Sequence, residues 1–129
     1  MDQKLINIFL DKKNVYAVVG ASRDPAKYGH QIYQDLRDGG YRVYPINPNA
    51  KTILGDKCYP SLNNLPVKPD VVDVVVPPKI ALKTAAECVK QKIDKIWLQP
   101  GSESDDVLEF CRDNNLKVVY GVCVMVQRR

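Results

Sequence analysis

The chain has 129 residues and a mass of 14.5 kDa, with 45% hydrophobic and 26% charged residues, which excludes a disordered chain and predicts a single domain over residues 1–129. The formal net charge of +4 comes from 19 Lys and Arg against 15 Asp and Glu. This mild, scattered positive charge favours a small polyanionic ligand and makes a nucleic-acid partner unlikely.

The beginning of the sequence does not resemble an export signal. Asn7 interrupts the apolar residues 5–10, and the charged residues 11–13 follow them directly. The apolar stretches of the chain are also shorter than the roughly 20 residues that a membrane-spanning helix needs. We therefore expect a cytoplasmic protein without membrane contact.

The first half of the chain alternates helix-like and strand-like segments. Residues 5–10 predict a short helix, and residues 14–19 form an apolar run typical of a strand buried on both faces. Residues 29–38 predict an amphipathic helix, and residues 41–46 predict a second strand. Residues 49–68 are rich in loop-forming residues, with room for one short strand and one helical turn.

The second half continues the alternation. Its predicted elements are a strand at 71–76, a helix at 79–91, a strand at 95–98, a helix from Ser102 or Ser104 to about Asn114, and a strand at 117–120. Buried strands that alternate with helices form a parallel sheet, because right-handed crossovers place the helices on both faces. The sequence therefore predicts an α/β fold, a Rossmann-like, doubly wound parallel five-stranded sheet in three α/β/α layers.

The loop after the first strand is the strongest candidate for ligand binding, because ligands of such sheets lie beyond the carboxyl ends of the strands. Gly20 allows a tight turn, Ser22 offers a hydroxyl, and the helix that begins near Gly29 presents its positive dipole end. Arg23 and Lys27 add positive charge. The spacing differs from the G-x-G-x-x-G turn of dinucleotide sites, so we predict a wider phosphate-binding loop.

The ends of the next two strands narrow the ligand class. An NAD site needs an acidic residue at the end of the second strand, but no acid follows residues 41–46 until Asp56, which disfavours NAD. NADP stays conceivable through Arg42 or Lys51. After the third strand, the rigid pair of residues 77–78 could pack against an adenine ring, or it could simply begin the next helix.

The four cysteines, Cys58, Cys88, Cys111 and Cys123, are widely spaced and form no C-x-x-C pair. Because His30 is the only histidine, the sequence disfavours a zinc site, and we predict separate thiols in a reducing compartment rather than disulfides.

Five ordered motifs resemble those of the small stand-alone CoA-binding proteins, which are similar to the N-terminal CoA-binding domain of the succinyl-CoA synthetase α subunit. The resemblance covers nearly the whole chain. The motifs are VVGASRDPAKYG at 18–29, VYPINP at 43–48, VVVPP at 74–78, IWLQPG at 96–101 and VYGVC at 119–123.

The resemblance implies that coenzyme A, free or acylated, binds along the strand ends. This agrees with a basic glycine-serine loop that lacks an acidic partner for a nicotinamide ribose. The implied contacts are Gly20, Ala21, Ser22, Lys27 and Tyr28 on phosphate, Asn47 and Pro48 at the turn near the nucleotide phosphates, Val76, Pro77 and Pro78 beside the adenine, and Gln99 and Pro100 along the pantetheine.

The chain also departs from the synthetase, which forms a phosphohistidine on a second domain. His30 lies at the start of the predicted helix 29–38, where we expect a polar residue near the phosphate loop. We therefore expect a non-catalytic carrier, buffer or sensor of CoA or an acyl-CoA. Cys123, near the position of a cysteine turn in the synthetase, could form a mixed disulfide with the CoA thiol, or it could be a buried apolar cysteine.

Two other functions stay open at this point. The chain could be a subunit of an acyl-CoA ligase or an NADP-dependent oxidoreductase, if a partner supplies the histidine domain or if NADPH binds. It could also be a ligand-controlled regulatory module for a protein or nucleic-acid partner that the sequence does not identify. Residues 127–129 could make such contacts, although we interpret them as a frayed basic tail.

Overall fold

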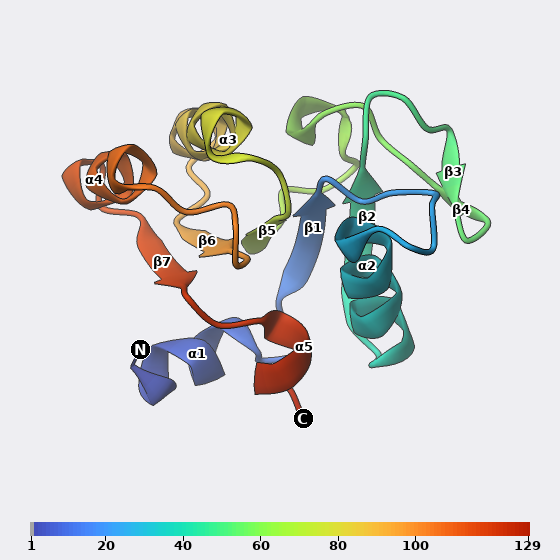
Figure 1. Ribbon diagram of the computed structural model, residues 1–129, viewed down its shortest axis with the longest axis horizontal. Helices are drawn as coiled ribbons and strands as arrows, with labels where there is room; N and C mark the ends of the chain where they lie inside the picture. Colours follow the sequence, from blue (N-terminus) through green and yellow to red (C-terminus); the bar gives the residue numbers. More distant parts are fainter. Residues whose placement is uncertain (1) are drawn as a thin grey trace.

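A computed structural model describes residues 2–129 and confirms the Rossmann-like α/β fold. The main sheet contains five strands, and helices precede, separate and follow them (Figure 1). The strands are β1 Val15–Val19, β2 Arg42–Ile46, β5 Val71–Val74, β6 Lys95–Leu98 and β7 Lys117–Tyr120. The helices are α1 Gln3–Phe9, α2 Tyr28–Asp38, α3 Pro78–Lys90, α4 Asp105–Asp113 and α5 Val124–Gln127.

The strand order is β2-β1-β5-β6-β7, and every neighbouring pair is parallel. From β1 the chain moves outward to β2, whereas from β5 it moves the other way to β6. The order therefore reverses between β1 and β5. In a doubly wound sheet this switch point opens a crevice at the carboxyl ends of the two strands, where ligands bind.

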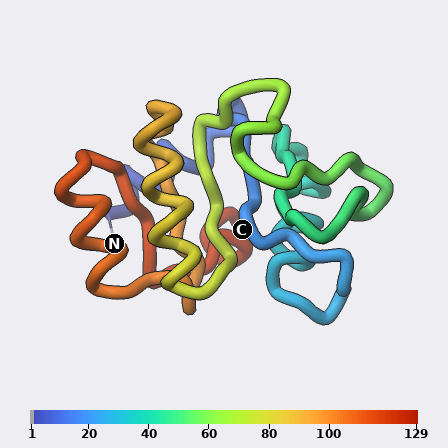
Figure 2. The backbone as a smooth tube through the Cα atoms, turned by 90° about the horizontal axis from the view of Figure 1, so that it is seen from above, coloured from blue at the N-terminus to red at the C-terminus, as the bar shows by residue number. Residues whose placement is uncertain are grey.

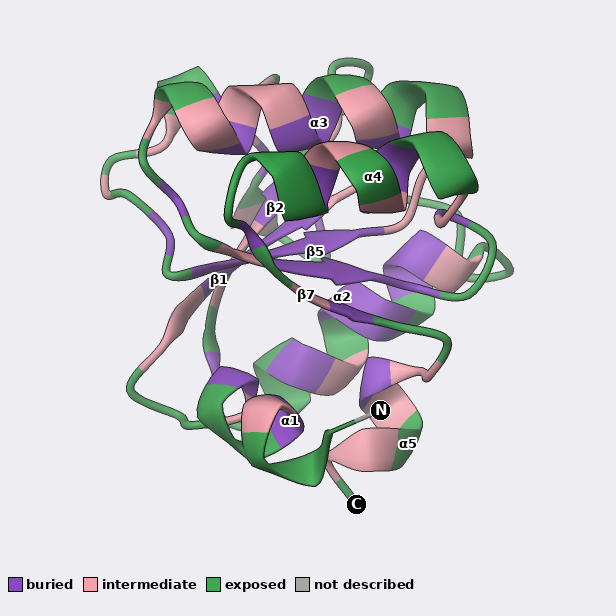
Figure 3. Cartoon of the chain, turned by 90° about the vertical axis from the view of Figure 1, so that its left-hand side faces the viewer, coloured by how far each residue is buried: buried purple, intermediate pink, exposed green. Residues whose placement is uncertain are grey.

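The helices cover both faces of the sheet. Helices α3 and α4 lie on one face, and α1, α2 and α5 lie on the other (Figure 3). The core beside α1, α2 and α5 is built around Trp97, Tyr16 and Phe9, all fully buried. The opposite core is aliphatic, with Val74 and Leu98 against the small side chains of α3. Burial on both faces explains the continuous apolar strand sequences.

Local sequence signals set the ends of several helices. The Ser104 hydroxyl accepts a hydrogen bond from the Val107 N–H and caps α4, so this helix begins after Ser104 and not after Ser102. Pro78 is the first residue of α3, a position where its missing N–H costs no helical hydrogen bond. Strand β5 ends at Val74, two residues before the predicted end.

The loop-rich region contains more structure than we predicted. Strands β3 Thr52–Ile53 and β4 Asp56–Lys57 form an antiparallel hairpin, and the short 3-10 helix η1 Leu62–Asn64 follows. Leu54 and Gly55 both have positive φ, as in a tight primed turn, but Leu is an uncommon residue there and gave no signal. Figure 2 shows this region, in green, beside the loop after β1, in light blue.

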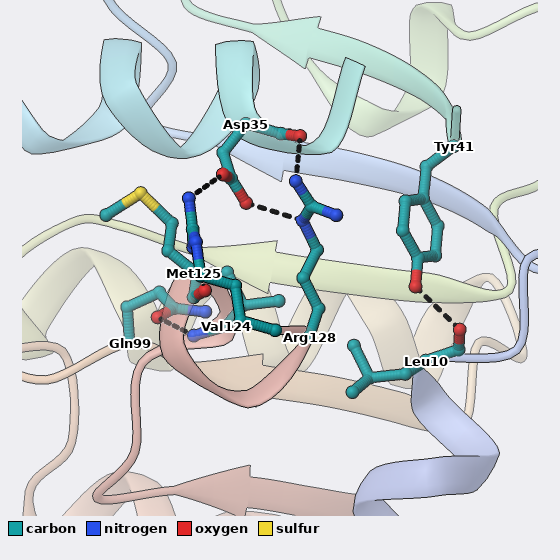
Figure 4. Close-up of polar contacts among 8 residues, drawn as sticks. Leu10, Asp35, Tyr41, Gln99, Val124, Met125 and Arg128 are labelled. Atoms are coloured by element: carbon teal, nitrogen blue, oxygen red, sulfur yellow. Dashed lines mark hydrogen bonds and ion pairs between the residues drawn. The ribbon is translucent and has the colours of Figure 1, made fainter. Parts of the chain in front are cut away.

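The C-terminus is not a frayed tail, so that interpretation is wrong. Arg128 forms an ion pair with Asp35 of α2 at 2.6 Å between Nε and Oδ2 (Figure 4). The short helix α5 packs its buried Val124 into the core between α2 and the sheet. Within residues 2–129, we find no helix long and apolar enough to cross a membrane.

Candidate ligand-binding site

A pocket of about 430 Å³ lies at the carboxyl ends of β1, β2 and β5, at the switch point of the sheet. Small-molecule sites typically have volumes of about 300–1,000 Å³. Its lining is mostly apolar, with a few polar groups at the strand ends and on α3. The lining residues are Val19, Gly20, Ile46, Asn47, Pro48, Pro60, Ser61, Leu62, Val76, Ile80, Lys83, Thr84 and Glu87.

Four of the sequence-predicted site residues lie in this pocket, namely Gly20, Asn47, Pro48 and Val76. The others surround it on the same edge of the sheet, in the loop after β1 and in the turns after β5 and β6. Pro77 and Pro100 are exposed there, and Pro78 is half-buried. Arg42 lies at the opposite edge, because it is the first residue of β2, and its guanidinium donates to the Tyr44 hydroxyl. The prediction that Arg42 could contact NADP at the carboxyl edge is therefore wrong.

Two glycines determine the path of the loop after β1. Gly20 has a φ of +97°, and a Cβ there would lie 2.2 Å from the Val75 carbonyl oxygen. A Cβ on Gly29 would lie 1.9 Å from the carbonyl oxygen of Gly20. The loop therefore leaves β1 in a left-handed turn and returns so closely that the first turn of α2 touches Gly20.

The tip of the loop carries groups that suit an anion. The Ser22 hydroxyl oxygen accepts a hydrogen bond from the Asp24 N–H at 3.1 Å, which leaves the hydroxyl proton available to a ligand. Arg23 and Lys27 are exposed, and neither forms an ion pair with any residue from 2 to 129. Lys27 precedes the first turn of α2 without capping it, so its charge adds to the positive end of the helix.

Asn47 fixes the loop from the end of β2. Its Nδ2 donates to the carbonyl oxygen of the buried Ala21 at 2.8 Å, and its Oδ1 accepts from the Asn49 N–H at 2.8 Å. Its own N–H donates to the Tyr59 carbonyl oxygen at 3.0 Å. Asn47 therefore positions the loop, and the exposed Pro48 follows it at the mouth of the pocket.

Ser102 ties the turn after β6 to the end of β5. Its buried hydroxyl donates to the Val74 carbonyl oxygen at 3.1 Å and accepts from the Val76 N–H at 3.2 Å. These bonds set the course of the chain into Pro77, which precedes the first residue of α3. The sequence predicts Ser102 only as a possible helix cap. No local pattern connects it to Val74, at the end of β5, which lies 28 residues earlier in the chain.

A buried polar network lies below the ends of β5, β6 and β7. The Gln99 side chain is fully buried; its Nε2 donates to Asp73 Oδ1 at 2.7 Å, and its Oε1 accepts from the Val124 N–H at 3.1 Å. The Tyr28 hydroxyl lies 2.8 Å from Cys123 Sγ and 3.4 Å from Gln99 Oε1. Burial, followed by the hydrogen bond to Cys123, raises the pKa of Tyr28.

Asp73 anchors this network and has an unusual protonation equilibrium. Complete burial raises its pKa from 3.8 to about 7, although the Gln99 amide partly offsets this effect. Its Oδ2 has no hydrogen-bond partner among the described residues, which disfavours the ionised form further. A charged residue within the apolar run 71–76 was the signal that sequence analysis could have used.

The remaining histidine and cysteines have mainly structural surroundings. His30 is buried, and its Nδ1 lies 2.8 Å from the Ser22 carbonyl oxygen, which confirms its expected place beside the loop. Cys58, Cys88 and Cys111 are buried thiols, whereas Cys123 is partly exposed. Over residues 2–129 the structure brings together no group of three or more His, Cys, Asp or Glu side chains that could hold a metal ion.

Comparison with known proteins gives a consistent result. A family model described as a CoA binding domain matches residues 14–129. The α subunit of ADP-forming acetate–CoA ligase II from Pyrococcus furiosus is 34% identical over 93% of this chain, and the match covers 28% of that subunit. This chain spans between 12% and 28% of the length of the first acetate–CoA ligases that it matches.

Smaller proteins match over most of their length. The uncharacterized protein YneT from Bacillus subtilis is 26% identical, and the match covers 94% of this chain and 90% of YneT. The structure of a conserved hypothetical protein from Pyrococcus furiosus superimposes with a TM-score of 0.84 at 44% identity, covering 88% of this chain and 98% of that chain. Chains of this size and fold therefore occur outside the large ligase subunits.

Proposed function

The chain belongs to the CoA-binding domain family, and from this premise we propose that it binds coenzyme A across the carboxyl ends of its strands. One observation carries the proposal: an apolar pocket at the switch point adjoins a loop whose exposed cations have no acidic partner among residues 2–129. An adenine suits the pocket, and a pyrophosphate suits the loop. A nicotinamide dinucleotide fits less well, because Asn47 and not an acid follows the end of β2.

In the proposed complex the adenine lies against Val76 and the adjacent Pro77, in the pocket beside α3. The phosphates lie against the backbone of Gly20 and the Ser22 hydroxyl, where Lys27 and the start of α2 supply positive charge. The pantetheine arm then follows the strand ends from β5 toward β6 and β7. This direction leads past Pro100 to the network around Gln99.

We propose that this chain by itself carries, buffers or senses CoA or an acyl-CoA without catalysing a reaction. The matched ligases are several times longer, so any part of this chain in an acyl-CoA ligase would need a partner that supplies the remaining domains. A regulatory module that responds to CoA is the alternative in which binding itself is the function. All these roles require the same ligand site, so the site is tested first.

Calorimetric titration with CoA, acetyl-CoA, NAD and NADP in parallel tests the proposal. We expect CoA to bind with a micromolar dissociation constant and the dinucleotides to bind much more weakly. Lys27→Ala and Ser22→Ala should each weaken CoA binding, by about five- to twentyfold, as for the loss of one charge-assisted hydrogen bond. Lys4→Ala, an equal charge change on the exposed side of α1, is the control. Preferential binding of NADP, or binding of none of the four, would overturn the proposal.

A mixed disulfide between Cys123 and the CoA thiol is a second hypothesis, supported by the partial exposure of this cysteine at the end of the crevice. With CoA disulfide as the oxidant, the Cys123 thiolate would attack one sulfur, form the mixed disulfide and release one CoA thiolate. Intact-mass spectrometry should then show one CoA adduct per chain, which Cys123→Ser abolishes. An unmodified wild-type chain, or an adduct on a buried cysteine, would contradict it.

A further inference from the structure

The last nine residues, 121–129, form a segment that we call the C-terminal strap. The strap leaves β7 at the carboxyl edge of the sheet and turns back over the face that α2 covers (Figure 1). Its first half contacts the candidate site. Trp97 Nε1 donates to the Val122 carbonyl oxygen at 3.0 Å, and the Val124 N–H donates to Gln99 Oε1 at 3.1 Å. Cys123, between these two residues, lies against the Tyr28 hydroxyl.

The second half of the strap is fastened to α2 through Asp35, as Figure 4 shows. Arg128 Nε lies 2.6 Å from Asp35 Oδ2, and its Nη2 donates to the Asp35 carbonyl oxygen at 3.0 Å. Arg129 Nη2 lies 2.8 Å from Asp35 Oδ1. The Asp35 side chain is 9% exposed and the Arg128 side chain 18%, so the bond between these two is sheltered from water and is stronger than a typical surface ion pair.

The residue that follows α2 leaves space for the ion pair between Asp35 and Arg128, which we call the clamp. Gly39 follows the last residue of α2, and a Cβ there would lie 2.5 Å from Arg128 Nη1. Gly39 has an ordinary negative φ of −78°, so the backbone conformation does not require glycine at this position. A side chain there would force the Arg128 guanidinium to move from its position beside Asp35. Three separate features, namely Asp35, Arg128 and Gly39, thus agree on one docked position of the strap.

We propose that Asp35 and Arg128 are positioning residues for the pantetheine arm of CoA. They dock the strap so that the partly exposed Cys123 completes the wall of the crevice that receives the thiol end of the ligand. The inference rests on the proposed function, in which the nucleotide occupies the pocket at β1, β2 and β5. The strand order is β2-β1-β5-β6-β7, so an elongated ligand that extends from this pocket toward β6 and β7 would reach the strap with its far end.

This arrangement links strap docking to ligand affinity. Only the docked state offers the complete wall. The apparent affinity for CoA is therefore the affinity of the docked state multiplied by the fraction of molecules in which the strap is docked. The nucleotide half of CoA, 3′-phospho-ADP, ends before the strap and makes no use of that wall. Loosening the clamp should therefore weaken CoA and leave 3′-phospho-ADP unchanged.

Calorimetric titration of the purified chain with both ligands separates these effects. Arg128→Ala removes the clamp charge, and Gly39→Ala displaces the guanidinium while keeping every charged group. If each reduces the docked fraction to about a tenth, CoA affinity falls about tenfold and 3′-phospho-ADP affinity does not change. Arg112→Ala is the control, because Arg112 is exposed and, among residues 2–129, forms an ion pair only with the adjacent Asp113.

Hydrogen exchange gives a second readout on the wild-type protein. The amides of residues 122–128 should gain protection when CoA binds and show no gain with 3′-phospho-ADP. Equal weakening of both ligands in the clamp variants, or no weakening of either, would overturn the positioning role while CoA binding stands. If the wild-type chain binds neither ligand, the proposed function itself fails, and the positioning role fails with it.

Discussion

Single residues inside the sheet determine how the ligand edge is organised, and Asp73 is the clearest case. It interrupts an otherwise apolar strand between the register partners Val18 and Trp97, where a charge is costly. Its bond to the Gln99 amide orients that side chain, so that Gln99 Oε1 faces the strap and Tyr28. One buried carboxyl group thus helps to arrange polar groups of Gln99, Tyr28 and the C-terminal strap.

The protonation of Asp73 leads to a prediction about stability. Since its pKa is raised from 3.8 to about 7, the folded chain keeps a proton that the unfolded chain has lost between these pH values. Rising pH therefore lowers the free energy of unfolding through this group, by about 1.4 kcal/mol per pH unit at most, with no further loss above the folded pKa. Asp73→Asn removes this dependence.

Urea denaturation of both proteins at pH values from 4 to 8.5 measures the effect. Other carboxylates titrate alike in the two proteins, so the difference between their stabilities isolates Asp73. We expect the wild type to lose stability relative to Asp73→Asn as pH rises toward 7, and the difference to stay constant above it. Parallel curves across the whole range would contradict the raised pKa.

At the scale of elements, the agreement between sequence and structure depends on whether a signal is local. The five strands and the four longer helices carry continuous or periodic apolar patterns, and each lies within a few residues of its predicted place. Helix α5 has four residues and no periodic pattern. It is held in place by its first residue and by the residues on either side of it. These bond to Trp97, Gln99 and Asp35, which are distant in sequence.

The same distinction applies to the candidate site. Glycines, cations and prolines at strand ends are visible in the sequence, so Gly20, Lys27 and Pro77 could be proposed from it. The bonds that hold those groups in place could not, because Asn47 reaches Ala21 and Ser102 reaches Val74 only after the sheet has formed. Sequence patterns indicate which groups contact a ligand, and long-range packing determines which groups position them.

The hydrogen bonds between Ser102, in the turn after β6, and the chain at the end of β5 give a prediction at this scale. Ser102→Ala leaves the Val76 N–H and the Val74 carbonyl oxygen without their side-chain partner, at an estimated cost of about 1–3 kcal/mol in stability. It should also weaken CoA binding, because the chain entering α3 forms one side of the adenine pocket. Denaturation and calorimetric titration measure the two effects separately.

Ser104→Ala provides the matched control, two residues further along the same turn. It removes the cap of α4 and should cost about 1 kcal/mol in stability without any effect on CoA. If Ser102→Ala behaves like Ser104→Ala and leaves CoA affinity intact, the Ser102 bonds do not contribute to the ligand site.

At the scale of the whole molecule, the residues that we propose to bind the ligand lie at one edge of the sheet, at the carboxyl ends of the strands. The crossovers after β1 and β5 depart to opposite faces, as α2 and α3 (Figure 3). The candidate pocket lies at the carboxyl ends of these two strands. The pocket, the loop after β1 and the C-terminal strap all meet at this edge. The opposite edge contains the amino ends of the strands, including Arg42, and has no part in the proposed site.

This layout predicts binding without turnover. The chain contains one histidine, and His30 is buried with its Nδ1 2.8 Å from the Ser22 carbonyl oxygen, which disfavours it as the acceptor of a phosphoryl group. Asp73 and Gln99 are fully buried, so neither side chain is exposed to act as an acid or base. From the burial of these groups we expect the chain to bind its ligand without forming an acyl phosphate.

We accordingly expect the purified chain to bind CoA without forming acetyl-CoA from acetate, ATP and CoA. Chromatographic measurement of CoA and acetyl-CoA over hours checks this, with a complete ADP-forming acetate–CoA ligase as the positive control. Formation of acetyl-CoA that requires both ATP and acetate would contradict the non-catalytic role. Because a trace of contaminating ligase gives the same product, such activity would count only if Lys27→Ala, prepared identically, lowered it in proportion to its loss of CoA affinity.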